Sequence, residues 1–278
     1  MNRIDGKIAI VTGGTQGLGA AIAKQFAEAG AAGIVICGRT AAKGKAVAAE
    51  VTKIGEKSGA KTKVKFVAAD LGLVEDCRAV VAAADEMFGR VEILVNAAGI
   101  TDRGDILGTS PELFDRMFAV NTRGPFFLMQ ESIRRMIRDQ VEGAIVNIGS
   151  VSELAGQPFI SAYCASKSAL ATLTRNTAFA VMRNRIRVNQ LSIGWMASDG
   201  EDKIQREFHG AKANWLDDAA KERPFGRLLA PEEVARAVNF LVSADAGMMT
   251  GAVIDFDQSV TGAFPFAPPS PPDVMKLG

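Results

Sequence analysis

Three side chains near the middle of the sequence have the types and the spacing for acid–base chemistry. Tyr163 is the only tyrosine of the chain, Lys167 follows it by four residues, and Ser150 precedes it by thirteen. Residues four apart lie on the same face of a helix. A helix through Tyr163 would therefore place its phenol beside the Lys167 ammonium.

A phenol needs a partner to act as a base near neutral pH. Tyrosine titrates near about 10, and a close positive charge favours the phenolate. We therefore predict that Lys167 lowers the pKa of Tyr163. The phenol would then give a proton to a carbonyl oxygen or take one from an alcohol, while Ser150 holds that oxygen by a hydrogen bond.

The rest of the sequence alternates between short apolar runs, typical of buried strands, and longer helical patterns. Strands are predicted at 7–12, 33–37, 63–69, 91–96, 143–149, 185–191 and 252–256. Helices are predicted from Gly19 to Gly30 and at 41–56, 73–88, 110–138, 159–182 and 232–243. This order predicts an α/β protein with a Rossmann-like, doubly wound parallel sheet of about seven strands and helices on both faces.

The domain organisation expected from this pattern is simple. Residues 1–264 contain no internal linker or low-complexity segment, so we expect one dinucleotide-binding and catalytic domain. The polar segment 195–223 is too irregular for a core element, and we expect a substrate lid near 195–225. Pro224 and Pro231 bracket a loop. Residues 265–278 hold five of the ten prolines and form a Pro-rich tail.

A glycine-rich turn follows the first predicted strand, between Gly13 and Gly19, and a helix follows the turn. Glycines let the backbone approach a pyrophosphate at a helix N-terminus, where free N–H groups favour anions. Roughly twenty residues further on, an acidic residue would bind the ribose 2′-hydroxyl of NAD. The chain has Gly38 and Arg39 there. A guanidinium suits a 2′-phosphate, so NADP(H) is favoured and NAD(H) remains possible.

Composition excludes several classes of protein. The net charge of +1 and the pI near 7.7 give no sign of a nucleic-acid or membrane partner. Three scattered cysteines suggest neither a disulfide framework nor a metal site, and they fit a reducing compartment. The N-terminus lacks a signal-peptide pattern, and no apolar run approaches the length of a membrane span. We expect a cytoplasmic protein that acts on a small molecule and binds no metal.

Taken together, the motifs resemble those of the short-chain dehydrogenase/reductase family, in its compact single-domain branch. The resemblance runs from about residue 5 to residue 258. The motifs that carry it are Thr12-Gly13-x-x-x-Gly17-x-Gly19, Asp70-Leu71, Asn96-Ala97-Ala98-Gly99, Asn121, Ser150 and Tyr163-x-x-x-Lys167.

The resemblance implies a catalytic tetrad of Asn121, Ser150, Tyr163 and Lys167, in which Asn121 holds a water and Lys167 also binds the nicotinamide ribose. It further implies a homotetramer formed through helices 110–138 and 159–182 and the last strand. The cofactor contacts that it implies are Gly13, Thr15, Gln16, Gly17, Leu18, Gly19, Arg39, Asp70, Leu71, Asn96, Ala97, Gly99, Tyr163, Lys167, Ile193 and Ser198.

Several positions depart from the family pattern, among them Ser198 in place of a threonine and Asp257-Gln258-Ser259 in place of Asp-Gly-Gly. Ala97 replaces an asparagine, Ile193 replaces a proline, and Gln16 stands where NADP-binding members often have a basic residue. The preference for NADP(H) therefore depends on Arg39 alone.

Several functions compete for this pattern. A serine hydrolase is excluded because Ser150 lacks a Gly-x-Ser-x-Gly context and the only histidine is His209. A non-catalytic cofactor sensor would be expected to have lost a tetrad residue. A 3-oxoacyl-[acyl-carrier-protein] reductase is the alternative within the enzyme class, with Arg134, Arg135 and Arg138 to receive an acidic carrier.

The preferred substrate is a small polar alcohol or its ketone, such as a sugar or polyol. Glu153, Gln157 and Trp195 lie near Ser150 and the reacting end by sequence position. Carboxylate and amide groups suit hydroxyls, and an indole suits the face of a sugar ring.

Overall fold

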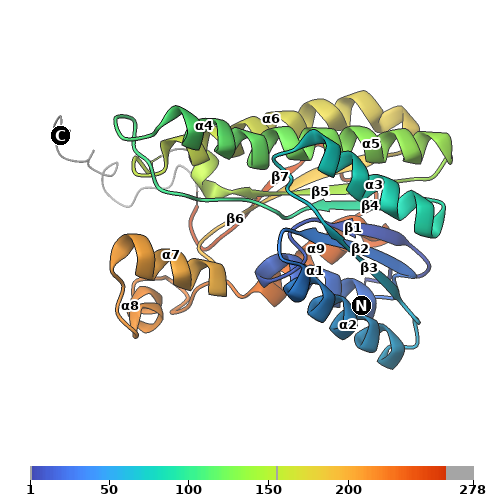
Figure 1. Cartoon of the computed structure of the whole chain (residues 1–278), viewed down its shortest axis with the longest axis horizontal. Helices are drawn as coiled ribbons and strands as arrows, with labels where there is room; N and C mark the ends of the chain where they lie inside the picture. Colours follow the sequence, from blue (N-terminus) through green and yellow to red (C-terminus); the bar gives the residue numbers. More distant parts are fainter. Residues whose placement is uncertain (1, 155, 261–278) are drawn as a thin grey trace.

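A parallel sheet forms the centre of the molecule (Figure 1). The computed structural model describes residues 2–154 and 156–260. Within these residues the sheet has seven strands in the order β3-β2-β1-β4-β5-β6-β7. The strands are β1 (Ile8–Val11), β2 (Gly33–Gly38), β3 (Lys63–Ala68), β4 (Ile93–Asn96), β5 (Ala144–Ser150), β6 (Arg187–Ile193) and β7 (Val253–Phe256). Every pairing is parallel, which confirms the predicted doubly wound α/β fold.

Helices cover both faces of the sheet (Figure 1). One face carries α1 (Gly17–Glu28), α2 (Ala41–Lys57) and α9 (Pro231–Val242). The other carries α3 (Val74–Phe88), α4 (Pro111–Phe118), α5 (Gly124–Arg138) and α6 (Ser161–Val181). Parallel strands need such crossover helices, which bury the sheet on both sides.

Two apolar cores form between the sheet and these helix layers. On the first face, Ile22 and Phe26 of α1 pack with Val234 and Val238 of α9. On the second face, Val80 of α3 packs among residues of α5 and β5. The central strands β1, β4 and β5 are buried along their whole lengths, which explains their continuous apolar runs in the sequence.

The strand order reverses between β1 and β4, and this reversal places the site. Val11 of β1 pairs with Ile36 of β2 on one side and with Val95 of β4 on the other. The connections from these two strands leave in opposite directions, so a crevice opens beyond their carboxyl ends. In open α/β sheets, ligands bind at this point.

The helix predicted at 110–138 is interrupted by a π-helical turn at Ala119–Arg123. Pro125 follows this turn and has no N–H group, so the carbonyl oxygen of Asn121 cannot accept the usual α-helical hydrogen bond from it. Short π-helical turns inside α-helices often occur at functional sites. Here the turn contains Asn121.

The polar segment 195–223 is not part of the core, as expected, but it contains two helices that the sequence did not predict. It forms α7 (Asp199–His209) and α8 (Trp215–Lys221), which lie apart from the sheet in Figure 1. Ser198 caps α7 by accepting a hydrogen bond from the Glu201 N–H at 3.1 Å, and Gly210 ends it in a left-handed conformation. No residue of α7 is buried, which explains why its polar sequence lacked an apolar stripe.

The predicted Pro-rich tail, 265–278, lies outside the described residues. In the chain as far as it is described, no helix combines the length and the apolar character needed to cross a bilayer.

Candidate active site

A cavity of about 1310 Å³ opens at the carboxyl edge of the sheet, beside the crevice between β1 and β4. Ligand pockets for drug-sized molecules usually measure about 300–1,000 Å³. The cavity is therefore large enough for a dinucleotide and a small substrate together. Sequence-predicted residues that line it are Gly13, Thr15, Gln16, Gly17, Leu18, Gly19, Arg39, Asp70, Leu71, Ala97, Gly99, Ser150, Gln157, Tyr163, Lys167, Ile193, Trp195 and Ser198. Asn96, Asn121 and Glu153 do not line it.

The glycine turn forms one wall of the cavity. A Cβ atom on Gly19 would lie 2.3 Å from the carbonyl oxygen of Gly13, so this close approach requires glycine. Gly13 and Gly17 have positive φ angles, +66° and +50°. The N-terminus of α1 has no side-chain cap and no acidic residue in its first turn. Its N–H groups can therefore bind an anion, and the turn fits the pyrophosphate of a dinucleotide.

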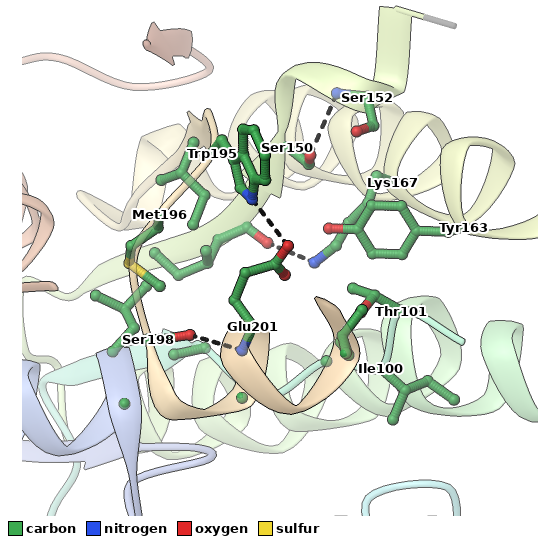
Figure 2. A pocket seen from close by; sticks show the side chains of 18 of the residues that line it. Ile100, Thr101, Ser150, Ser152, Tyr163, Lys167, Trp195, Met196, Ser198 and Glu201 are labelled. Atoms are coloured by element: carbon green, nitrogen blue, oxygen red, sulfur yellow. Dashed lines mark hydrogen bonds between the residues drawn. The ribbon is translucent and has the colours of Figure 1, made fainter. Parts of the chain in front are cut away.

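Tyr163, Lys167 and Ser150 come together on the opposite wall (Figure 2). Ser150 is the last residue of β5, and α6 carries the other two side chains on one face, as the spacing predicted. The Lys167 ammonium lies 5.8 Å from the centroid of the Tyr163 ring. It donates a hydrogen bond of 2.8 Å to the carbonyl oxygen of Ile148, which fixes it against β5.

Burial sets the protonation of both groups. It raises the pKa of Tyr163 to about 12, and the Ser150 hydroxyl opposes this only in part. It also lowers the pKa of Lys167 to about 8, although the nearby Glu153 carboxylate opposes the shift. The prediction that Lys167 lowers the phenol pKa was wrong for the protein alone, because desolvation of the phenolate is the largest influence on this pKa and raises it. At neutral pH the phenol is therefore protonated and can donate.

Asn121 lies behind the cavity wall and is completely buried. Its Oδ1 accepts a hydrogen bond from the Ile100 N–H at 3.0 Å, and its Nδ2 donates to the Ile100 carbonyl at 2.9 Å. A Cβ atom on Gly99 would lie 3.4 Å from the Asn121 Oδ1 and 3.6 Å from the Lys167 Nζ. The amide oxygen and the ammonium thus both border the Gly99 backbone.

An ion pair holds Asp70, one of the predicted cofactor contacts. Asp70 accepts two hydrogen bonds of 2.9 Å from the Nη2 of Arg116, a residue of α4. Burial opposes the Asp70 charge, but the hydrogen bonds from Arg116 and the Gly72 N–H outweigh it and lower the Asp70 pKa. Asp70 is therefore a fixed carboxylate. Arg116, which sequence reasoning missed, lines the same part of the cavity.

Asn96 is buried at the end of β4, where its Nδ2 donates a 2.8 Å hydrogen bond to the Oδ1 of Asn147. The turn that follows it reaches the cavity through Ala97 and Gly99. Thr12 holds this turn, since its Oγ1 accepts hydrogen bonds from the N–H of Ala97 and Ala98. Asn96 thus supports the turn from within the sheet.

Glu153 does not reach the cavity, although the sequence placed it near the substrate. The short 3₁₀ helix after β5 turns its carboxylate toward β6. There its Oε2 accepts a 2.5 Å hydrogen bond from Gln190 Nε2, and its Oε1 accepts one of 3.0 Å from Ser192 Oγ. Burial raises the Glu153 pKa. Its position in the turn, which the sequence did not reveal, directs it into the protein.

A different carboxylate faces Tyr163 and Lys167, that of Glu201 on the first turn of α7 (Figure 2). Its Oε1 accepts 2.8 Å hydrogen bonds from the indole N–H of Trp195 and from Gln205 Nε2. Its negative charge contributes to the raised pKa of the Tyr163 phenol. Sequence reasoning missed Glu201, and the only available signal was its place three residues after the capping Ser198.

Helix α7 contacts the opposite rim of the cavity through His209. Its Nε2 accepts a hydrogen bond of 3.1 Å from the Nε of Arg103, and its ring meets that of Phe159 edge-on at 5.9 Å. The rings of Trp195, which precedes α7, and Trp215, at the start of α8, stack 6.0 Å apart. These contacts fix α7 and α8 over the cavity.

Comparison with known proteins decides the family. A family model described as "Enoyl-(Acyl carrier protein) reductase" matches residues 13–261. The chain belongs to the short-chain dehydrogenase/reductase family. It is thus an oxidoreductase, and members of this family generally use NAD(P)(H).

The short-chain dehydrogenases/reductases most informative here act on different compounds. Galactitol 2-dehydrogenase of Agrobacterium fabrum is 33% identical over 261 residues, covering 92% of this chain and 97% of the relative. Tetrahydroxynaphthalene reductase of Pyricularia oryzae is 30% identical, with coverage of 91% and 89%. The structure of levodione reductase superposes with a TM-score of 0.85 at 27% identity, covering 92% of this chain and 98% of that one.

Proposed function

We propose that this chain is an NAD(P)-dependent dehydrogenase/reductase that interconverts a secondary alcohol and a ketone on a small, polar, sugar- or polyol-like molecule. The observation that carries the proposal is the single cavity that joins the glycine turn to Ser150, Tyr163 and Lys167. A nicotinamide cofactor would supply hydride transfer there. The glycine turn and the uncapped N-terminus of α1 would hold its pyrophosphate.

The protein's own residues would handle the proton and the substrate oxygen. The Tyr163 phenol, protonated at neutral pH, would donate to the oxygen of a ketone, and Ser150 would hold that oxygen. The buried Lys167 ammonium would stabilise negative charge that develops on the phenol. Asn121, fixed in the π-helical turn, would keep the Lys167 side of the site in place.

NADP(H) is the favoured cofactor in this proposal. Arg39 lines the cavity just after β2, where no acidic residue would repel a 2′-phosphate. A second cation lies close by, since Lys43 Nζ donates a 2.8 Å hydrogen bond to Oε1 of Gln16 in the glycine turn. Lys43 supplies the positive charge that Gln16 itself lacks.

A polar substrate is supported by the side chains that the lid and the rim present. Glu201 offers a carboxylate, Gln157 an amide and Trp195 an indole face. The galactitol dehydrogenase relative agrees with such a substrate. The polar segment near 195–225 would act as the substrate lid of a single domain that spans residues 1–264.

The alternative of a 3-oxoacyl-[acyl-carrier-protein] reductase loses its main support. Arg134 pairs with Glu131 at 2.8 Å, and Arg135 and Arg138 pair with Asp85 at 3.0 and 2.6 Å. These arginines are neutralised within the chain, so they offer little charge to an acidic carrier.

We also propose a cytoplasmic homotetramer. Phe126 of α5 and Phe179 of α6 are 41% and 76% exposed, which suits burial between subunits. Cys37, Cys77 and Cys164 are all free thiols, as a reducing compartment would keep them.

The test is a panel of alditols, ketoses, aldonates and simple ketones, assayed with NADP(H) and with NAD(H) by the absorbance of the reduced nicotinamide. Turnover of polyhydroxylated compounds above simple ketones supports the proposal. Exclusive turnover of acyl thioesters would replace it with the alternative.

A further inference from the structure

We propose that the substrate carries a carboxylate, bound by Arg103 while Arg223 adds positive charge to the same cavity, so that the natural substrate is a sugar acid or its keto form. This inference rests on the proposed function and narrows its substrate class. It starts from two guanidinium groups that line the same cavity as Tyr163. Neither belongs to the residues that would hold the cofactor or transfer the proton.

Arg103 lies on the loop between β4 and α4 and is only partly exposed. Its Nε donates to His209 and its Nη1 donates to the Thr101 carbonyl at 2.8 Å. Its guanidinium lies 5.6 Å from the centroid of the Phe159 ring. These contacts hold the guanidinium rigidly, yet all of these partners are neutral when His209 accepts the hydrogen bond.

No carboxylate among the described residues forms a salt bridge with Arg103. The guanidinium is close enough to the Tyr163 phenol to favour its ionised form. A partly buried cation without a counterion is costly for the protein. A bound anion near the reacting oxygen would supply that counterion.

Arg223 gives a second, independent indication. Its guanidinium lies 5.6 Å from the centroid of the Trp195 ring, and its Nε is buried without a hydrogen-bond partner. Its ion pair is a loose contact of 3.7 Å with the adjacent Glu222, whose side chain is 75% exposed. Exposed pairs of this kind contribute little, so most of the charge and one buried donor of Arg223 remain available.

The acidic residues that line this part of the cavity do not neutralise the two arginines. Glu201 already accepts hydrogen bonds from Trp195 and Gln205, and it is suited to accept further ones from hydroxyl groups. Glu222 is exposed and Asp257 lies beyond β7. A ligand whose hydroxyls reach Glu201 and whose anionic group reaches Arg103 satisfies both groups, while Arg223, over the Trp195 ring, adds positive charge to the same cavity. A sugar acid has this arrangement.

The experiment compares neutral and anionic forms of one carbon chain. The kcat and KM values are measured for the alditols galactitol and glucitol and for the aldonates galactonate and gluconate. Glucitol 6-phosphate is the phosphate arm, which tests whether a phosphate replaces the carboxylate. We expect the aldonates to have the highest kcat/KM. In Arg103→Gln, the KM of the aldonates should rise about ten- to hundred-fold more than that of the alditols, since one charge-assisted interaction is lost. Arg103→Lys should recover part of the loss.

Arg206→Gln is the matched control, because Arg206 is an exposed arginine of α7 that pairs with Asp202 and does not line the cavity. Equal effects of Arg103→Gln on alditols and aldonates would overturn the inference, and so would higher kcat/KM for the alditols. A preference for the phosphate arm would replace the carboxylate with a phosphate.

A binding measurement separates this inference from the proposed reaction. Galactonate should raise the melting temperature of the wild type and raise it much less in Arg103→Gln and in Arg223→Gln. If no compound is turned over, but galactonate still stabilises only the wild type, the anion site stands and the proposed reaction falls. If galactonate stabilises neither the wild type nor the variants, the anion site falls.

Discussion

Replacing Lys167 with Met should make the protein more stable while destroying its activity. Lys167 is 5% exposed, and burial lowers its pKa from 10.5 to about 8. The folded protein therefore holds a charge that it solvates poorly. Methionine fills similar space with a flexible apolar chain and removes that charge.

The size of the effect follows from the pKa shift. A depression from 10.5 to about 8 corresponds to about 3 kcal/mol at pH values below both. The variant also loses the hydrogen bond to the Ile148 carbonyl, which destabilises it by about 1 kcal/mol and offsets part of this gain. We expect a net gain of about 2 kcal/mol at pH 7, or about 4–8 °C in melting temperature for a chain of this size.

The pH dependence distinguishes this cause from better packing. Between about pH 8 and 10.5 the unfolded chain binds a proton at Lys167 that the folded chain has released, so wild-type stability rises with pH there. The advantage of Lys167→Met is therefore full below pH 8 and disappears as pH approaches 10.5.

The assay is thermal and urea unfolding of both proteins at pH 7 and at several values up to pH 10, at one protein concentration. Lys203→Met, at an exposed lysine of α7, is the control and should change stability by less than about 0.5 kcal/mol. A Lys167→Met protein that is less stable than wild type at pH 7, or more stable by an amount that does not depend on pH, would refute the reasoning.

Three further outcomes are expected. Tyr163→Phe should keep cofactor binding, measured by fluorescence titration, and lose about 10²–10⁴-fold in turnover, because the proton donor is gone; near-normal turnover would remove Tyr163 from its role. Arg39→Ala should weaken NADP binding about 10- to 150-fold and leave NAD binding nearly unchanged, whereas equal weakening of both would make Arg39 a surface residue. Phe179→Glu should reduce the mass measured by light scattering, since a charge on an apolar interface opposes association; a wild type that is already monomeric would contradict the tetramer.

The fold was predictable because burial leaves a simple signature. Strands that are covered on both faces read as unbroken apolar runs, and the glycine turn and the crossover helices follow them in order. The pairing of Lys167 with Tyr163 was predictable from spacing, since residues four apart on a helix share one face. Local rules decide these features.

The features that the sequence did not reveal depend on contacts between distant segments. Glu153 and Glu201 are both carboxylates near the predicted catalytic residues, but Gln190 and Ser192 of β6 draw the first into the protein. Helix α7 brings the second to the cavity. Likewise, Lys43 reaches Gln16 only because α2 lies beside α1. Sequence distance contains no information about such pairings.

The pKa values of Tyr163 and Lys167 show that burial of the charged site destabilises the folded protein. Both shifts have one main cause, the removal of water from the floor of the cavity. In such surroundings a charge is expensive to hold, but its field on a neighbour is also stronger than in water. The desolvation that destabilises the Lys167 ammonium therefore strengthens its action on the phenol when negative charge develops there. A variant that removes the stability penalty must also remove this action, so stability and activity should change in opposite directions at position 167.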